Sequence, residues 1–149
     1  MVRSSNTHAE RLFVILHKAS KAVSLFDQNS IKELGFASQS DFAVLEYLQT
    51  KGPQPVNAIG RSMMLTSGAI TTAVDRAEKK GFVKRVPCPE DRRVTKVTLT
   101  PEGSDLIGRA FEIHVTNMEK LFAVLDRTER LEFIRLVKKV GKAAEALNL

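Results

Sequence analysis

The stretch Leu65–Gly103, LTSGAITTAVDRAEKKGFVKRVPCPEDRRVTKVTLTPEG, predicts a short helix, a β-hairpin and the start of another helix. Thr66 is suited to cap the first helix, because its hydroxyl can accept a hydrogen bond from a free N–H of the first turn. Apolar residues recur at helical spacing and predict one buried face: Ile70, Ala73, Val74 and Ala77. Gly81 stands where a helix end favours a left-handed residue. The other face of this helix, expected over Ser67–Lys80, carries small polar and basic side chains suited to a nucleic-acid groove.

Two short segments after this helix predict a hairpin. They are Phe82–Val86 and Arg93–Leu99, of which the second shows the alternation of a strand. The turn between them contains two prolines, which stiffen it, and Arg92 stands at its end. Thr100 then begins a new helix as its N-cap, with Pro101 in the first helical position.

Positive charge is concentrated in the same stretch. From Arg76 to Lys96 there are eight basic and three acidic residues, a net charge of +5, against +6 for the whole chain. A basic run is often no more than a solvated face. Here it coincides with a capped helix and a pointed hairpin, so we expect nucleic-acid binding.

These residues resemble the winged helix-turn-helix core of MarR-type transcriptional regulators. The resemblance is carried by LTSGAITTAVDRAEKKGFVKR and by the wing sequence PEDRRVTKVTLTPEG, in which Asp-Arg-Arg precedes a strand and a Thr-x-x-Gly helix start. It is sharpest over about forty residues. The expected helices elsewhere are compatible with it over nearly the full length.

The residues ahead of the quoted stretch complete a helix-turn-helix. A helix capped by Ser38 is stopped by Lys51–Pro55, and a short helix over Val56–Met63 follows. Met64-Leu65 is the expected turn into the recognition helix. The order is helix, helix, tight turn, helix and hairpin, which is a winged helix-turn-helix.

Three further helices carry long apolar seams. The first begins near Ala9 after a frayed segment, residues 1–8, and is ended by Gly35. The seams are Leu12, Leu16, Ala19, Val23 and Phe26; Ile107, Phe111, His114, Met118, Leu121 and Leu125; and Leu131, Ile134, Val137, Val140, Ala144 and Leu147. An intramolecular three-helix bundle is one explanation. Burial between two copies explains the excess better, and in the resembling family these helices form the dimer interface.

We therefore expect a mainly α fold with a small β-hairpin wing. Residues 38–100 would form the DNA-binding lobe, and residues 1–37 and 101–149 a helical dimerisation region. The expected function is a homodimeric transcriptional regulator that binds double-stranded DNA, a ligand-responsive repressor on an inverted-repeat operator. The alternative is a winged-helix protein–protein interaction module without specific DNA readout.

The candidate DNA contacts follow from this docking. The recognition helix offers base-edge or phosphate contacts from its N-terminal half onward: Thr66, Ser67, Thr71, Thr72 and Arg76. In the wing, Arg92 is expected to enter the minor groove, whose negative potential attracts arginine. Asp91 is expected to hold one of the two arginines, and Arg93 to meet a phosphate. Backbone N–H groups near Val56 and Asn57 are further phosphate contacts.

The resemblance also implies a small-molecule effector, often an aromatic acid, between the DNA-binding lobe and the dimer helices. The candidate lining residues are Phe13, His17, Phe36, Tyr47 and Phe111. The alternative for each of them is ordinary core packing.

Other chemistry finds little support in the sequence. Cys88 is the only cysteine, so an internal disulfide is excluded, and this thiol is either a bystander or a redox sensor activated by basic neighbours. No Cys or His pair has metal-ligand spacing, and no enzyme motif is present, so we expect no metal, no cofactor and no catalysis. There is no apolar run of membrane-spanning length and no signal-peptide pattern, so we expect a cytoplasmic protein without a membrane partner.

Overall fold

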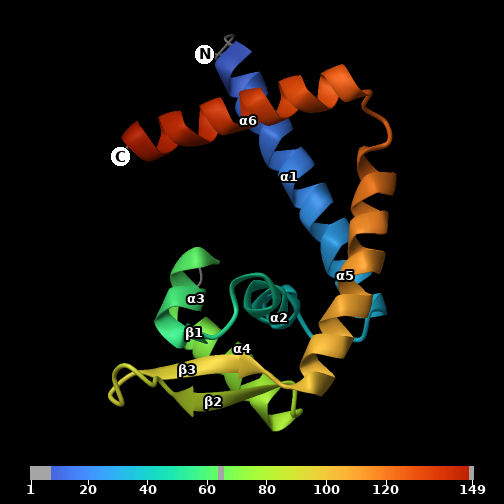
Figure 1. The fold of residues 1–149 in the computed structure, drawn as a ribbon. Coiled ribbons are helices and arrows are strands. Elements are labelled where there is room, and N and C mark those ends of the chain that lie inside the picture. Colours follow the sequence, from blue (N-terminus) through green and yellow to red (C-terminus); the bar gives the residue numbers. More distant parts are fainter. Residues whose placement is uncertain (1–7, 64–65, 148–149) are drawn as a thin grey trace. The chain divides into compact units, whose positions relative to one another are not determined.

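The computed structural model describes residues 8–63 and 66–147 of the 149-residue chain, and its contacts divide the chain into two units, residues 1–114 and 115–149 (Figure 1). The elements are α1 (His8–Glu33), α2 (Gln39–Lys51), β1 (Gln54–Pro55), α3 (Val56–Ser62), α4 (Ser67–Lys79), β2 (Val83–Pro87), β3 (Thr95–Leu99), α5 (Pro101–Phe122) and α6 (Arg127–Leu147). The expected mainly α fold with a small wing is confirmed. The frayed segment and the Met64-Leu65 turn fall on residues outside those described, except that His8 opens α1.

Side-chain caps set the starts of three helices in the first unit. The hydroxyl oxygens of Ser38, Thr66 and Thr100 accept hydrogen bonds from the backbone N–H three residues on, at 3.2, 3.2 and 3.1 Å. Each bond satisfies an N–H that the helix itself leaves free. Gly35 and Gly81 follow α1 and α4 with φ of 88° and 77°, which is the left-handed conformation expected of them.

The sheet has three antiparallel strands in the order β1-β3-β2. The hairpin strands lie within one or two residues of the expected ranges, and Val83 pairs with Leu99. The strand β1 was not expected, because Lys51–Pro55 was interpreted only as a helix stop. Its two residues pair with Val97 and Lys96 at an edge of the sheet, where a proline without an N–H is tolerated.

One hydrophobic core, entirely in the first unit, joins α2, α3, α4 and the sheet. Its buried members are Ile31, Phe36, Phe42, Val44, Leu45, Leu48, Ile59, Ile70, Ala73, Val74, Ala77, Val83, Val97, Ile107 and Ala110. The predicted inner face of α4 is thus confirmed, with all four of its apolar residues buried. This packing leaves the opposite face of α4 in solvent.

The second unit contains the end of α5 and α6. A capping box starts α6: Asp126 accepts from the N–H of Glu129, and Glu129 accepts from the N–H of Asp126, both at 2.9 Å. No residue of α6 between Arg127 and Leu147 is buried. The expected boundaries between the DNA-binding lobe and the dimerisation region, at residues 37/38 and 100/101, stay a prediction. The two compact units of the structure meet at a different place, between residues 114 and 115.

A close approach of two backbones fixes the start of α5 beneath the end of α4. Thr100 donates from its N–H to the carbonyl of Phe82 at 3.0 Å, and its hydroxyl donates to the carbonyl of Gly81 at 2.6 Å. A Cβ added to Gly103 would lie 1.9 Å from the carbonyl oxygen of Phe82. Only glycine fits at this position, because the obstacle is backbone.

We expect Gly103→Ala to lower the free energy of unfolding by about 2–4 kcal/mol, through a clash that only backbone movement relieves. Gly108→Ala is the matched control in the same helix, because a Cβ there meets nothing within 4 Å. It should be neutral or stabilising by about 0.5–1 kcal/mol. Urea unfolding of the two variants measures both values. Equal stabilities would show that the two backbones do not approach this closely.

Candidate nucleic-acid interface

The exposed face of α4 starts with short side chains. Ser67, Thr71 and Thr72 are all exposed, as expected for groups that touch a nucleic acid. A hollow of about 440 Å³ between α3 and α4 is lined by Val56, Asn57, Gly60, Arg61, Ser67, Ile70 and Thr71. The structure therefore brings together four of the residues that we selected from the sequence, from two different helices.

Two threonine hydroxyls of this helix are already engaged. Thr66 caps the helix, and Thr72 donates from its hydroxyl to the carbonyl of Gly68 at 2.8 Å. The hydroxyl proton of Thr72 is thereby used within the helix. What remains for a partner is its methyl group and its oxygen lone pairs.

Arg76 is directed toward α2. Its Nε lies 3.0 and 3.2 Å from the two carboxylate oxygens of Asp41, and its Nη2 lies 2.5 Å from Asp41 Oδ1 and 3.4 Å from Ser38 Oγ. The hydrogen bond with Asp41 raises the pKa of Arg76 above its ordinary value, against the opposing effect of burial. From the sequence, Arg76 was expected to contact DNA, and its partner Asp41 was not identified. The only feature of the sequence that drew attention to Asp41 was its position in the first turn of a helix.

A second arginine joins the wing to α4. Arg85, on β2, pairs with Asp75 at 2.6 Å and with Glu78, whose carboxylate also accepts from the Arg85 N–H at 3.2 Å. The hydrogen bond with Asp75 is the first cause of the raised pKa of Arg85. The sequence signal was two acids three residues apart on a helix, ten and seven residues before an arginine, and it is weak.

The loop of the wing is closed by backbone bonds. Cys88 N–H donates to the carbonyl of Val94 at 2.8 Å, and Val94 N–H donates to the carbonyl of Asp91 at 2.9 Å. The carboxylate of Asp91 accepts from the N–H of Arg93 at 3.0 Å. We expected Asp91 to hold one of the two arginines, and in the structure its carboxylate contacts Arg93 through the backbone N–H.

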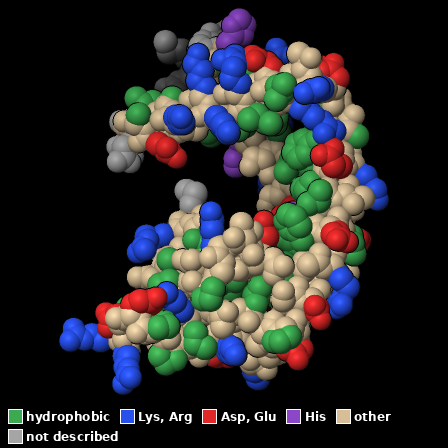
Figure 2. All heavy atoms as spheres, in the orientation of Figure 1, with side chains coloured by type: hydrophobic (Ala, Val, Ile, Leu, Met, Phe, Trp, Pro, Cys, Tyr) green, Lys and Arg blue, Asp and Glu red, His purple; other side chains and the backbone are tan. Residues whose placement is uncertain are grey.

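The wing presents its cations outward. Arg92 and Arg93 are exposed, and Figure 2 shows Lys and Arg side chains projecting from the end of the hairpin. Cys88 is buried and donates from Sγ to Glu90 at 2.7 Å, which is the first cause of the lowered pKa of Glu90. Lys96 lies 3.7 Å from the same carboxylate. The nearest charged partner of the thiol is thus an acid, not the base that its activation requires.

The five residues expected to line an effector pocket lie in different surroundings. Phe13 and His17 are exposed on α1 and stack with ring centroids 6.2 Å apart. Phe36 is buried in the core, and Tyr47 is half-buried against it. Phe111 is 41% exposed on α5. The ligand-binding role of these residues stays a prediction. None of them lines a hollow beside α2, which is described next.

That hollow, of about 400 Å³, is lined by Asp27, Ile31, Gln39, Ser40, Phe42, Ala43, Glu46, Met63 and His114. The rings of His114 and Phe42 lie 4.9 Å apart, and Gln39 donates to Asp27 Oδ2. His114 Nδ1 and Asp27 Oδ1 face each other at 3.6 Å, and both atoms are buried without a hydrogen-bond partner within the described part of the chain. A group that could bond to both is the natural complement of this site.

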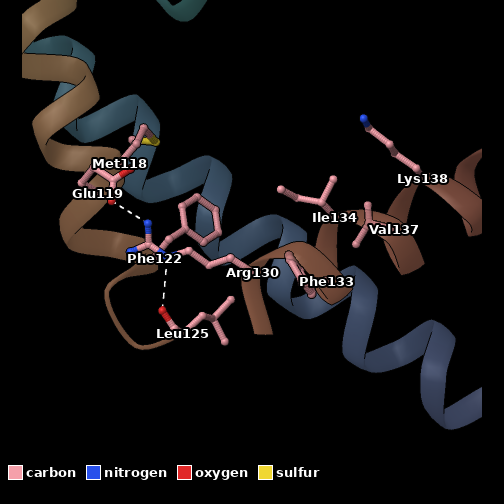
Figure 3. A pocket seen from close by; sticks show the side chains of 9 residues that line it. All are labelled: Met118, Glu119, Phe122, Leu125, Arg130, Phe133, Ile134, Val137 and Lys138. Carbon is pink, nitrogen blue, oxygen red and sulfur yellow. Dashed lines mark hydrogen bonds and ion pairs between the residues drawn. The ribbon is translucent and has the colours of Figure 1, made fainter. Parts of the chain in front are cut away.

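The second unit has an apolar hollow of its own, of about 430 Å³, between α5 and α6 (Figure 3). It is lined by Met118, Glu119, Phe122, Leu125, Arg130, Phe133, Ile134, Val137 and Lys138. Arg130 closes one end, because its guanidinium bonds to Glu119 at 2.6 Å and to the carbonyl of Leu125 at 3.2 Å. Apart from Lys138, the other lining residues are apolar.

The described ranges, residues 8–63 and 66–147, were also searched for a membrane-spanning helix and for a metal site. Within them no helix has the length and hydropathy needed to cross a bilayer. The same ranges hold no group of three His, Cys, Asp or Glu side chains placed to bind a metal ion.

A helix pair with an exposed second helix, followed by a basic antiparallel hairpin, defines a winged helix-turn-helix protein. The MarR family pattern matches residues 37–95. The uncharacterized HTH-type transcriptional regulator YkoM of Bacillus subtilis is 35% identical over 133 residues, 89% of this chain and 86% of that protein. The HTH-type transcriptional regulator MhqR of the same organism is 34% identical, over 93% of this chain and 94% of its own length.

Among solved structures, reduced AbfR bound to DNA matches with a TM-score of 0.73 and 26% identity, covering 95% of this chain and 94% of that one. The chain belongs to the MarR family of winged helix-turn-helix transcriptional regulators. Members of this family are generally not enzymes.

Proposed function

We propose that this protein is a homodimeric repressor that binds an inverted-repeat DNA operator in the cytoplasm and responds to a small-molecule effector. The observation that carries the proposal is the arrangement of α4 and the wing. A helix whose exposed first turns bear short polar side chains is tied by Arg85 to a hairpin that carries two exposed arginines. The helix fits a major groove, and the hairpin reaches the neighbouring minor groove.

The contacts divide by chemistry. Ser67, Thr71 and Thr72 would face base edges, because short side chains let the helix approach the bases closely. Arg92 would enter the minor groove and Arg93 would meet a phosphate. The first turn of α3 follows Pro55 without a side-chain cap, so its N–H groups are available to a phosphate oxygen.

Two copies would bury the apolar surface that one copy leaves exposed. Large exposed residues include Leu12 at 68%, Phe13 at 69% and Ile15 at 54% on α1, and Leu131 at 63%, Ile134 at 49% and Val140 at 54% on α6. Figure 2 also shows hydrophobic side chains uncovered along α5. Exposed apolar surface on this scale marks an interface. A two-fold pair supplies two recognition helices.

An effector would fit the hollow beside α2. Phe42, Ala43 and Met63 give this hollow an apolar side, and Gln39, Ser40 and Glu46 give it polar groups, which together suit an aromatic molecule with a polar substituent. The first turn of α2 lines this hollow through Gln39 and Ser40, and α2 packs against α4. Binding there would therefore act on the element that supports the recognition helix.

Arg92→Ala should weaken binding to a selected operator by about 1–3 kcal/mol without changing fold or assembly, because the side chain is exposed and contacts DNA alone. Arg109→Ala, which removes an exposed arginine from α5, is the matched control for net charge. Fluorescence anisotropy at moderate salt measures both. Equal affinities of Arg92→Ala and the unchanged protein would contradict the wing assignment.

The protein should sediment at about twice its chain mass of 16.5 kDa at micromolar concentration. Ile134→Asp should shift it toward the monomer, because Ile134 is 49% exposed on the apolar face of α6 that we assign to the interface, and the change places a charge there. Val124→Asp is the control, since Val124 lies in the same unit but is 83% exposed outside that hollow. A monomeric parent protein, or dissociation by both variants alike, would argue against the assigned interface.

A dimer should read half-sites about 10 bp apart, on one face of the duplex. We expect an insert of about 5 bp between half-sites of a sequence selected from random DNA to reduce affinity close to the non-specific level. An insert of about 10 bp returns both half-sites to the same face of the duplex, so it should recover part of the lost affinity. Undiminished binding to the 5-bp insert would mean that the two heads do not engage together. Failure to select any sequence would favour a protein–protein module.

A further inference from the structure

The guanidinium of Arg76 is hydrogen-bonded to residues at the start of α2. Two of its nitrogens bond to the carboxylate of Asp41, and Nη2 also reaches the hydroxyl of Ser38. Ser38 is itself the N-cap of α2. A planar fork bonded to a carboxylate at two points has directional preference as well as attraction. This contact joins two residues that are 35 positions apart in sequence, on different helices.

The carboxylate of Asp41 is buried, with its side chain only 8% exposed, whereas Arg76 keeps 39% of its side chain exposed. A charge removed from water in this way is stable only when it is paired. If Arg76 turned outward to a phosphate or a base, the carboxylate would stay behind without its partner. A contact with DNA would therefore compete against an interaction that the free protein already makes.

The buried face of α4 consists partly of small side chains. The inner face of α4 contributes Ile70, Ala73, Val74 and Ala77, and two of these four are alanines. Small side chains interlock poorly, so apolar packing alone defines the depth of α4 better than its rotation about its axis. The off-axis ion pair with Asp41 restrains that rotation from the side of α2, as the pairs of Arg85 with Asp75 and Glu78 do from the wing.

We propose that Arg76 is a positioning residue: its ion pair with Asp41 sets the rotation of the recognition helix, and base edges are read by the short side chains at the start of that helix. The proposal rests on the proposed function of α4 in reading DNA. Under this proposal, Arg76 does not contact DNA directly. Sequence specificity depends in addition on Asp41, a buried residue of another helix.

The test compares Arg76→Gln, Asp41→Asn and the double variant on two probes: a duplex selected from random DNA and a shuffled duplex of the same length. Each variant should bind the selected duplex on the order of tenfold more weakly, and the shuffled duplex within about twofold of the parent. The double variant should be no weaker than either single one, because both changes break the same pair. The salt dependence of binding should stay unchanged in all three.

Circular dichroism and thermal unfolding show whether each variant folds. Arg76→Lys is the replacement to use if one of the other variants does not fold. It keeps the charge but loses the fork, so it should also lose preference for the selected duplex. A direct phosphate contact predicts a different pattern: Asp41→Asn binds normally, and Arg76→Gln lowers the salt slope by about 0.9. That result would overturn the positioning role. A parent protein that does not distinguish the two duplexes would reject the proposed function, and the positioning role with it.

Discussion

The burial of one face of α4 is the constraint on which the other features depend. Ile70 and Val74 are inserted into the core with almost no exposure, and this determines which side of the helix remains in solvent. The polar linkages then act around that buried face. Asp41 holds the helix from α2, and Arg85 holds it from the wing. The reading surface is therefore the outer side of a helix restrained from two directions.

The distribution of charge shows that a basic run can serve two purposes. Arg76 and Arg85 are committed to acids of the same lobe, and they contribute to the fold of the reading head more than to its surface. The exposed cations of this run are those of the wing loop, the end of α4 and Lys84 on β2. Net charge near DNA is the same in either case, but only the exposed group can release counterions from phosphates.

Local signals in the sequence predicted the local structure well. Thr66 and Thr100 were identifiable as caps because capping depends on a few adjacent residues, and the periodicity of α4 revealed its inner face. Non-local features were missed. The strand β1 forms only because β3 lies beside it, and Asp41 becomes the partner of Arg76 only when α2 meets α4. The effector-binding role of the five ring-bearing residues selected from the sequence stays a prediction.

The central claim is that the start of α4 and the wing loop make contact with DNA. Amide hydrogen exchange with and without a selected duplex, at a protein concentration that keeps assembly constant, tests it most directly. The account predicts slower exchange on binding at residues 67–72 and 88–94, and unchanged exchange along α6. Protection confined to α6, or absent from both the helix start and the wing loop, would contradict it.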